Sequence, residues 1–206
     1  MSFGPNVTAT TRKRPPRDPV RTDVPFEFVH INKCGGSSIE IALGLTKSHD
    51  TAAIRRDKIG AEAWDKAFTF ATIRNPFDRI VSIYYYRVRT DQGGMADRHL
   101  NINDWVREAL GERNPAYFEG NQLLWPALRW LSDDDQIIVD HIARLEDIEM
   151  EWLEICTRLG IDRRLSVFNN NLHPPHGAIL NAASRAVIED VFAEDLETFG
   201  YRFETI

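Results

Sequence analysis

Two short segments carry the side chains with the clearest chemistry. The first is FVHINKCGGSSIE, residues 28–40, in which an apolar run is followed by a lysine, two glycines and two serines. A glycine-rich turn from a strand into a helix presents backbone N–H groups and the positive end of the helix dipole to an anion. The lysine adds a compact positive charge and the serines add hydroxyl donors. Taken alone, this segment fits a phosphate-binding loop and an ordinary glycine-rich turn equally well. The residues concerned are Lys33, Gly35, Gly36, Ser37 and Ser38.

The second segment is TIRNPFDRIVSIYYY, residues 72–86. Arg74 ends an apolar run, Asn75 is suited to cap a helix, and Pro76 to open it. A guanidinium at the carboxyl end of a strand suits a phosphate group. Ser82 lies two turns into the expected helix and adds a hydroxyl. Taken alone, the segment more simply predicts an arginine paired with a surface carboxylate and a neutral helix serine.

These side chains need a framework that brings strand ends together. Strands separated by helices predict parallel pairing and an α/β fold, a three-layer P-loop-like sandwich whose central, mostly parallel sheet is flanked by helices. Ligands of such sheets bind beyond the carboxyl ends of the strands. Apolar runs predict strands at 26–31, 67–73 and 136–143, and amphipathic spacing predicts helices at 36–45, 75–88, 145–160 and 184–198.

Length and composition favour one folded domain. The 206 residues, 43% of them hydrophobic, can bury one substantial core. Residues 1–24 include the Pro- and Arg-rich stretch TRKRPPRDPVRTD, so we expect a flexible basic leader there and one domain over residues 25–206.

Charge and cysteine content argue against several other classes. The net charge of -6 argues against a basic surface that binds nucleic acid. Cys34 and Cys156 lie far apart without metal-ligand spacing, so we expect free thiols in a reducing compartment. No apolar run approaches the ~20 residues that span a bilayer, and the N-terminus lacks a signal-peptide apolar core. We expect a cytoplasmic protein without a transmembrane segment.

Together the two segments resemble the sulfotransferase superfamily. HINKCGGSS (30–38) is similar to the family loop H-I-P-K-T-G-G-[ST]-S, and RNPFDRIVSIY (74–84) to the element R-N-P-x-D-R-x-x-S-x-Y. IARLEDIE and the C-terminal FAEDLETFGYRF are also similar to family segments. The resemblance is to the carbohydrate branch that includes heparan sulfate 2-O-sulfotransferase, in a soluble bacterial form, and implies one sulfotransferase-like domain. Two departures are Asn32 in place of proline and Cys34 in place of threonine or serine.

The resemblance implies the donor 3'-phosphoadenosine 5'-phosphosulfate, the product adenosine 3',5'-bisphosphate and no metal. Lys33 would neutralise the bridging oxygen of the leaving group, helped by backbone N–H groups of the loop. Arg74 and Ser82 would hold the 3'-phosphate. The expected acceptor is a hydroxyl or amine of a carbohydrate, lipid or small molecule. The donor-binding residues implied are Lys33, Cys34, Gly35, Gly36, Ser37, Ser38, Arg74 and Ser82.

A hydroxyl acceptor requires a general base, for which His49 is the first candidate because histidine titrates near neutral pH. The alternative for His49 is a surface loop residue. Glu40 is the second candidate, although a solvent-facing helix glutamate is the simpler interpretation. His30 is expected to pack within its strand. His173 and His176 lie in a proline-broken loop that is either a lid over the nucleotide or a plain loop.

The acceptor side and the activity itself remain open at this stage. Residues 114–130 mix aromatic and amide side chains, which suits sugar rings, a lipid headgroup or core packing. Arg87 and Arg89 are either ligands of an anionic acceptor or ordinary surface residues. The oligomeric state is undetermined. Two alternatives to an active sulfotransferase are a non-catalytic nucleotide-binding or partner-binding relative and, with less support, a P-loop kinase, in which the lysine would follow the glycines.

Overall fold

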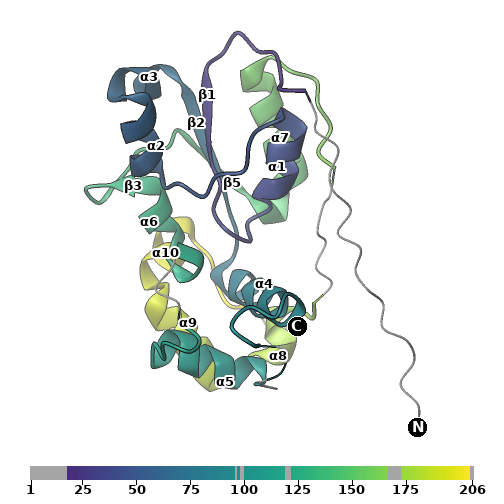
Figure 1. The fold of residues 1–206 in the computed structure, drawn as a ribbon, viewed down its shortest axis with the longest axis vertical. Coiled ribbons are helices and arrows are strands. Elements are labelled where there is room, and N and C mark those ends of the chain that lie inside the picture. Colours follow the sequence, from purple (N-terminus) through teal and green to yellow (C-terminus); the bar gives the residue numbers. More distant parts are fainter. Residues whose placement is uncertain (1–17, 96, 98–99, 119–121, 167–172, 205–206) are drawn as a thin grey trace.

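The computed structural model describes residues 18–95, 97, 100–118, 122–166 and 173–204. At its centre is a parallel sheet in the order β1-β2-β5, formed by Phe26–Val29, Phe68–Ile73 and His141–Arg144. Helices α1 and α7 cover one face of this sheet, and α2 and α3 cover the other (Figure 1). The predicted three-layer α/β architecture is therefore confirmed.

The remaining elements surround this sheet or form a helical layer beyond its carboxyl end, where α4, α5, α8, α9 and α10 lie (Figure 1). A short antiparallel hairpin, β3-β4, lies outside the central sheet. The helices are α1 (Gly36–Leu43), α2 (Ala52–Ile59), α3 (Ala61–Lys66), α4 (Pro76–Arg89), α5 (Ile102–Val106), α6 (Ala127–Leu131), α7 (Ile148–Leu159), α8 (His176–Ile179), α9 (Ala182–Val191) and α10 (Ala193–Phe199). Single turns are η1 (Arg107–Gly111), η2 (Gln122–Leu124) and η3 (Leu145–Asp147), and the hairpin strands are β3 (Ser132–Asp133) and β4 (Gln136–Ile137).

The sheet is buried on both faces because alternate residues of its strands point in opposite directions. Phe28 and Phe70 pack with Trp152 of α7 on one side. Val29 and Ala71 belong to a second cluster on the α2 and α3 side. With both faces packed, the carboxyl ends of the strands are held in fixed positions relative to one another.

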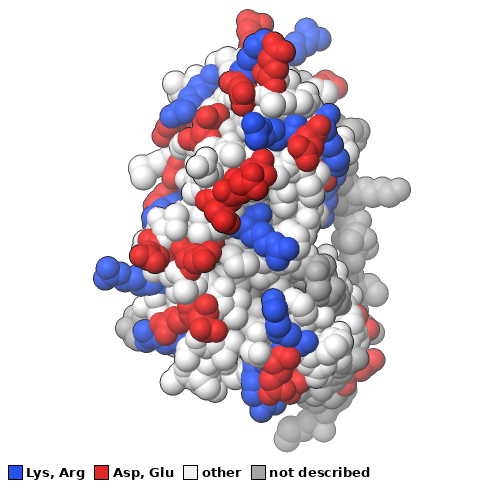
Figure 2. Space-filling model, turned by 90° about the vertical axis from the view of Figure 1, so that its left-hand side faces the viewer, with Lys and Arg blue, Asp and Glu red and all other residues white. Residues whose placement is uncertain are grey.

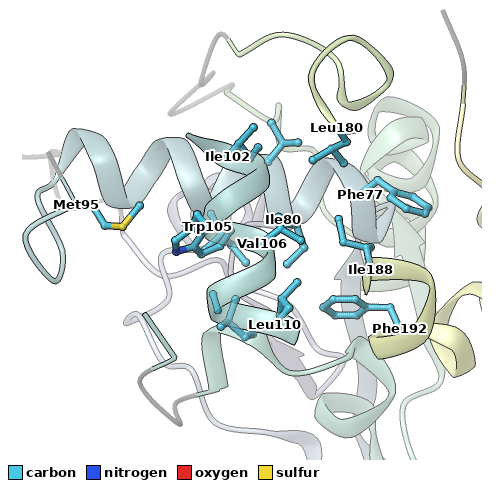
Figure 3. Packing of buried hydrophobic residues seen from close by; sticks show 14 residues of the cluster. Phe77, Ile80, Met95, Ile102, Trp105, Val106, Leu110, Leu180, Ile188 and Phe192 are labelled. Carbon is cyan, nitrogen blue, oxygen red and sulfur yellow. The ribbon is translucent and has the colours of Figure 1, made fainter. Parts of the chain in front are cut away.

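Helix α4, which follows β2, is fixed by a third apolar cluster. Phe77 and Ile80 of α4 pack with Trp105 of α5, and Ile188 and Phe192 close the cluster from the α9 side (Figure 3). Four of these five side chains are 0% exposed and Phe192 is 1% exposed, so α4 cannot rotate without opening the cluster. This packing therefore fixes the directions in which the polar side chains of α4 point.

The third predicted strand, 136–143, is wrong as a single element. Gln136–Ile137 form the outer strand of the hairpin, whereas His141–Arg144 form β5. Asp140 separates them, because its carboxylate accepts hydrogen bonds from the backbone N–H and the hydroxyl of Thr69, at 2.9 and 2.8 Å. The Asp140 side chain fixes the backbone at the start of β5. A prediction based on apolar residues alone does not detect this contact.

The last predicted helix, 184–198, is also wrong as a single element. Phe192 has φ -112° and ψ 22°, and it separates α9 from α10. The break lets Asp195 accept hydrogen bonds from the backbone N–H groups of Ala127 and Leu128, at 2.6 and 2.9 Å. Asp195 thereby caps the start of α6, a long-range role that local periodicity does not reveal.

Residues 18–24, which the sequence places in a flexible leader, are bonded to the domain. Residues 1–17 lie outside the described part of the chain. Val20 N–H donates to Leu43 O at 3.0 Å, and the Thr22 hydroxyl donates to Leu159 O at 2.6 Å. This segment therefore ties α1 to α7. The folded part of the chain therefore begins before the predicted boundary at residue 25.

The surface over α2 and α3 carries charges of both signs. Lysine and arginine side chains are interspersed with aspartate and glutamate on this face (Figure 2). Within the described residues, every helix is too short or too polar to cross a bilayer.

Candidate active site

The loop after β1 has the strained backbone of a close-approach turn. Lys33 has φ 66° and Gly35 has φ 82°, both in the left-handed region. A Cβ on Gly36 would lie 2.2 Å from the ring of His30, and one on Gly35 would lie 2.6 Å from the side chain of Leu145. Both glycines are thus required by their surroundings. The loop leads directly into α1, whose N-cap residue is Gly35.

Lys33 lies in a cationic and partly buried environment. Its Nζ lies 4.4 Å from the ring centroid of Tyr86 on α4, a cation–π contact. The pKa of Lys33 is lowered to about 8, mainly by burial and then by the charges of Arg89, Arg74 and Lys47. Several cations therefore converge on one ammonium group, and this arrangement favours an anion as the ligand.

Arg74 directly follows β2, and the next residue, Asn75, is held by Glu146. The Glu146 carboxylate accepts a hydrogen bond from the backbone N–H of Asn75 at 2.7 Å. Asn75 in turn caps α4, since its side chain accepts from Phe77 N–H at 3.1 Å, which confirms the predicted cap. Arg74 Nη2 lies 3.4 Å from Nε2 of His173. A guanidinium is thus held at the strand end beside an imidazole.

Arg79 joins the two predicted segments, a role that the sequence does not indicate. This arginine is 2% exposed, and its guanidinium donates to the carbonyl oxygens of Asn32, Trp125 and Leu123, at 3.0, 2.6 and 3.1 Å. The contact to Asn32 fastens the glycine loop to α4. A permanently charged fork is suited to hold several carbonyls at once. In the sequence, Arg79 is the second arginine of the element R-N-P-x-D-R-x-x-S-x-Y.

The remaining predicted donor residues occupy different environments. Ser82 is 2% exposed on α4, and Ser38 is 8% exposed, with its N–H donating to Gly35 O at 3.0 Å. Ser37 is half-buried at the start of α1. Cys34 is fully buried, and burial raises the pKa of its thiol to about 11. The Cys34 thiol packs in the core on the α2 and α3 side, and a place for this residue in the donor loop stays a prediction.

His49 lies against the end of β1. Its Nδ1 is 3.1 Å from the carbonyl oxygen of His30, and a carbonyl only accepts, so Nδ1 carries the proton and Nε2 the lone pair. Burial is the main cause that lowers the pKa of His49 below its ordinary value. Lys47 acts on both His49 and Lys33, which places the two in one neighbourhood. A neutral imidazole with an available lone pair is what a general base requires.

Glu40 is not the solvent-facing helix residue that the sequence suggests. It is 5% exposed, and its Oε1 accepts from His30 Nδ1 at 2.6 Å and from Ser48 N–H at 3.4 Å. His30 is 4% exposed and packed, as predicted. The carboxylate of Glu40 is therefore committed to neighbouring groups of the protein.

The other histidines and arginines singled out in the sequence make contacts within the protein. His176 is the first residue of α8 and does not lie in a loop. Its Nδ1 lies 2.9 Å from Asp78 Oδ1, and its Nε2 accepts a hydrogen bond from Glu204 N–H at 3.0 Å. His173 stacks on Tyr85 with ring centroids 5.8 Å apart. Arg87 is 1% exposed and donates to a backbone carbonyl, so its proposed contact with an acceptor is wrong in this conformation.

The aromatic segment 114–130 serves the core for much of its length. Leu124 and Trp130 are buried, and the Arg129 guanidinium lies 3.5 Å from the ring centroid of Trp125. Residues 119–121 of this segment lie outside the described part of the chain. An acceptor surface in this segment stays a prediction.

Three side chains at the opposite edge of the sheet bring metal-ligand atoms within 4.8 Å of one another: His141, Glu151 and Glu154. His141 opens β5, so this group lies at the amino ends of the strands. Its Nε2 faces Glu151 at 3.0 Å and its Nδ1 faces Glu154 at 3.6 Å. Arg158 also pairs with Glu154, at 3.0 Å. The His141 ring therefore lies between two carboxylates, one of which also pairs with an arginine.

The fold and the site define an α/β protein with a cationic loop at the carboxyl ends of its parallel strands. The chain belongs to the sulfotransferase family, whose sequence pattern it matches over residues 26–202. It is 26% identical over 113 residues to an uncharacterised protein of Archaeoglobus fulgidus, a match that covers 54% of this chain and 83% of that protein. It also aligns with the crystal structure of a sulfotransferase from Alicyclobacillus acidocaldarius, at 17% identity and a TM-score of 0.42, over 85% of this chain and 98% of the other.

Proposed function

We propose that the protein transfers a sulfuryl group from 3'-phosphoadenosine 5'-phosphosulfate to a hydroxyl or amine of a carbohydrate, lipid or small-molecule acceptor. One observation carries the proposal: the half-buried ammonium of Lys33 lies in a glycine loop at the strand ends, where the charges of Arg74 and Arg89 also act on it. The positive charges around Lys33 favour an anionic ligand, and a nucleotide with phosphate groups at both ends is such a ligand.

The donor is proposed to bind with its phosphosulfate at Lys33 and the start of α1. The N–H groups that open α1 and the Lys33 ammonium face the oxygens on which charge develops. Arg74 and Ser82 are proposed to hold the 3'-phosphate. Arg79 keeps the loop and α4 at a fixed separation through its bond to Asn32.

In the proposed reaction, the acceptor oxygen attacks the sulfur atom and the bond between sulfur and the 5'-phosphate oxygen breaks. Nε2 of His49 takes the acceptor proton, and its Nδ1–H remains on the His30 carbonyl. Lys33 neutralises the negative charge that appears on the departing phosphate oxygen. The charges that a divalent cation would cover are met by side chains and by the helix start, so the proposed mechanism uses no metal.

The state of Lys33 predicts how donor affinity depends on pH. With a pKa of about 8 in the free protein, Lys33 is charged below pH 8 and loses its charge as the pH rises further. Phosphate groups are already fully ionised in that range, because their second pKa is about 6. We therefore expect the affinity for adenosine 3',5'-bisphosphate to change little near pH 7, to fall about twofold by pH 8, and to approach a tenfold loss per pH unit above pH 9. Calorimetric titration at several pH values measures this slope.

Lys33→Arg is the matched control, because a guanidinium remains charged throughout this window. Its affinity is expected to stay flat as the pH rises, even if the absolute value is lower. Cys34 titrates at about 11 and so does not interfere. A wild-type affinity that remains flat up to pH 9.5 would show that Lys33 does not contact the nucleotide.

A further inference from the structure

Beneath the loop, the buried side chains of Glu40 and His30 lie beside the partly buried His49, and the first two have no step in the proposed reaction. We propose that Glu40 and His30 are a positioning pair, which holds the base His49 in register with the donor loop and selects its reactive tautomer. The inference rests on the proposed function only in taking His49 as the base. It assigns Glu40 an orienting role in place of proton transfer.

The first link of this group is the contact between Glu40 and His30. Their side chains are 6% and 5% exposed, and His30 Nδ1 lies 2.6 Å from Glu40 Oε1. A carboxylate accepts, so the proton of His30 is on Nδ1 and the ring orientation is determined. The same ring occupies the space beside Gly36 where a Cβ would lie, 2.2 Å from its Cδ2. The orientation that Glu40 imposes on His30 therefore shapes the donor loop.

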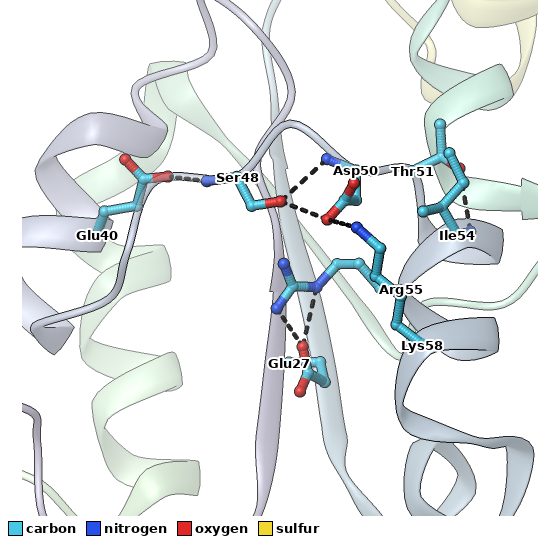
Figure 4. Close-up of polar contacts among 8 residues, drawn as sticks. All are labelled: Glu27, Glu40, Ser48, Asp50, Thr51, Ile54, Arg55 and Lys58. Carbon is cyan, nitrogen blue, oxygen red and sulfur yellow. Dashed lines mark hydrogen bonds and ion pairs between the residues drawn. The ribbon is translucent and has the colours of Figure 1, made fainter.

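The second link connects Glu40 to the segment that carries His49. Ser48, the preceding residue, donates its backbone N–H to Glu40 Oε1 at 3.4 Å. Asp50, the following residue, accepts from the Ser48 hydroxyl at 2.5 Å and pairs with Lys58 of α2 at 2.8 Å (Figure 4). Both neighbours of His49 are thus held, one by α1 and one by α2. His49 therefore lies on a segment that contacts with α1 and α2 hold in place.

The third link is His49 itself, which touches His30 twice. Its Nδ1–H donates to the His30 carbonyl, and the two ring centroids lie 4.4 Å apart. The edge of Trp130 of α6 approaches from the other side, at 6.5 Å between centroids. One residue, His30, therefore contacts the donor loop at Gly36 and the base at the same time.

The charges around His49 give this arrangement a measurable signature. Burial lowers the pKa of His49, the His30 carbonyl raises it, the His30 ring and Lys47 lower it, and Glu40 raises it. Glu40 supplies the negative charge in this set, and it favours the imidazolium that forms when His49 takes a proton. Loss of that charge therefore shifts the His49 titration to lower pH.

The test is Glu40→Gln in the full chain, which keeps the size of the side chain and one acceptor oxygen. Nitrogen NMR of the imidazoles is recorded across a pH titration, together with kcat, KM and the affinity for adenosine 3',5'-bisphosphate. We expect the pKa of His49 to fall and kcat to fall about tenfold, because the base loses the carboxylate charge that stabilises its protonated form. The acidic limb of the pH–rate profile should move in the same direction as the NMR titration.

Glu27→Gln is the matched control. Glu27 lies on β1 and pairs with Arg55 of α2, so the change removes a neighbouring carboxylate without touching His30 (Figure 4). We expect the His49 titration and kcat of this variant to match the wild type. If Glu40→Gln leaves the pKa of His49 and kcat unchanged, the positioning pair is wrong, although the proposed function stands.

The NMR measurement needs no turnover, so it tests the positioning pair even if the proposed sulfotransferase function is wrong. If the wild-type protein transfers no sulfuryl group but Glu40→Gln still shifts the His49 titration, the proposed function fails and the positioning pair holds. Should Glu40→Gln fail to fold, His30→Asn takes its place, since its amide N–H replaces Nδ1–H toward Glu40 but removes the ring. We expect that variant to weaken donor binding and kcat together, and unchanged values would contradict the proposal.

Discussion

Alanine in place of His49 is expected to lower turnover with a hydroxyl acceptor by roughly 10²- to 10⁴-fold, the usual contribution of a general base. Binding of adenosine 3',5'-bisphosphate should be unchanged, because His49 contacts the His30 carbonyl and not the proposed phosphate groups. Single-turnover rates and calorimetry on the same preparation separate the two effects.

His49→Asn is the informative companion variant. Its amide N–H can still donate to the His30 carbonyl, but it has no basic lone pair at the position of Nε2. Equal losses in the alanine and asparagine variants would assign the effect to the missing base. Turnover that survives both changes would exclude His49 as the base and return Glu40 or another group to consideration.

Arg74→Ala is expected to weaken binding of adenosine 3',5'-bisphosphate by about 2 to 5 kcal/mol, the range for removing one partner of a buried charge pair. That range corresponds to roughly a 30-fold to several-thousand-fold increase in Kd. The affinity for AMP should hardly change, because AMP lacks the 3'-phosphate. Calorimetric titration with the two nucleotides gives the comparison directly.

Arg158→Ala controls for the loss of a positive charge as such. Arg158 lies on α7, pairs with Glu154 and belongs to the opposite edge of the sheet. We expect it to leave both affinities unchanged. Equal losses for the bisphosphate and for AMP in Arg74→Ala would contradict the assignment of Arg74 to the 3'-phosphate.

The parts of the site that the sequence predicts are those with local causes. The turn at Gly35 and Gly36 and the start of α4 at Asn75 and Pro76 each follow from residue types at adjacent positions. The order of strands and helices then places both segments at the carboxyl ends of the sheet. For this reason the fold class and the neighbourhood of Lys33 and Arg74 could be predicted without coordinates.

The parts that could not be predicted depend on contacts between distant residues. Arg79 reaches Asn32 and Glu146 reaches Asn75, each across more than forty positions of the chain. Glu40 has the spacing of an exposed helix residue and is buried only because His30 faces it. The last predicted helix is broken at Phe192, and Asp195, beyond the break, caps the start of α6. Local patterns carry no record of these partners.

The donor site is the central claim, and calorimetric titration of the full chain with adenosine 3',5'-bisphosphate, compared with ATP and magnesium, tests it without knowledge of the acceptor. We predict tight binding of the bisphosphate and weak binding of ATP, because Arg74 is placed for a 3'-phosphate that ATP lacks. Preferential binding of ATP with magnesium would instead indicate a kinase-type loop. Binding of neither nucleotide would contradict the donor site and leave the fold to a partner-binding role.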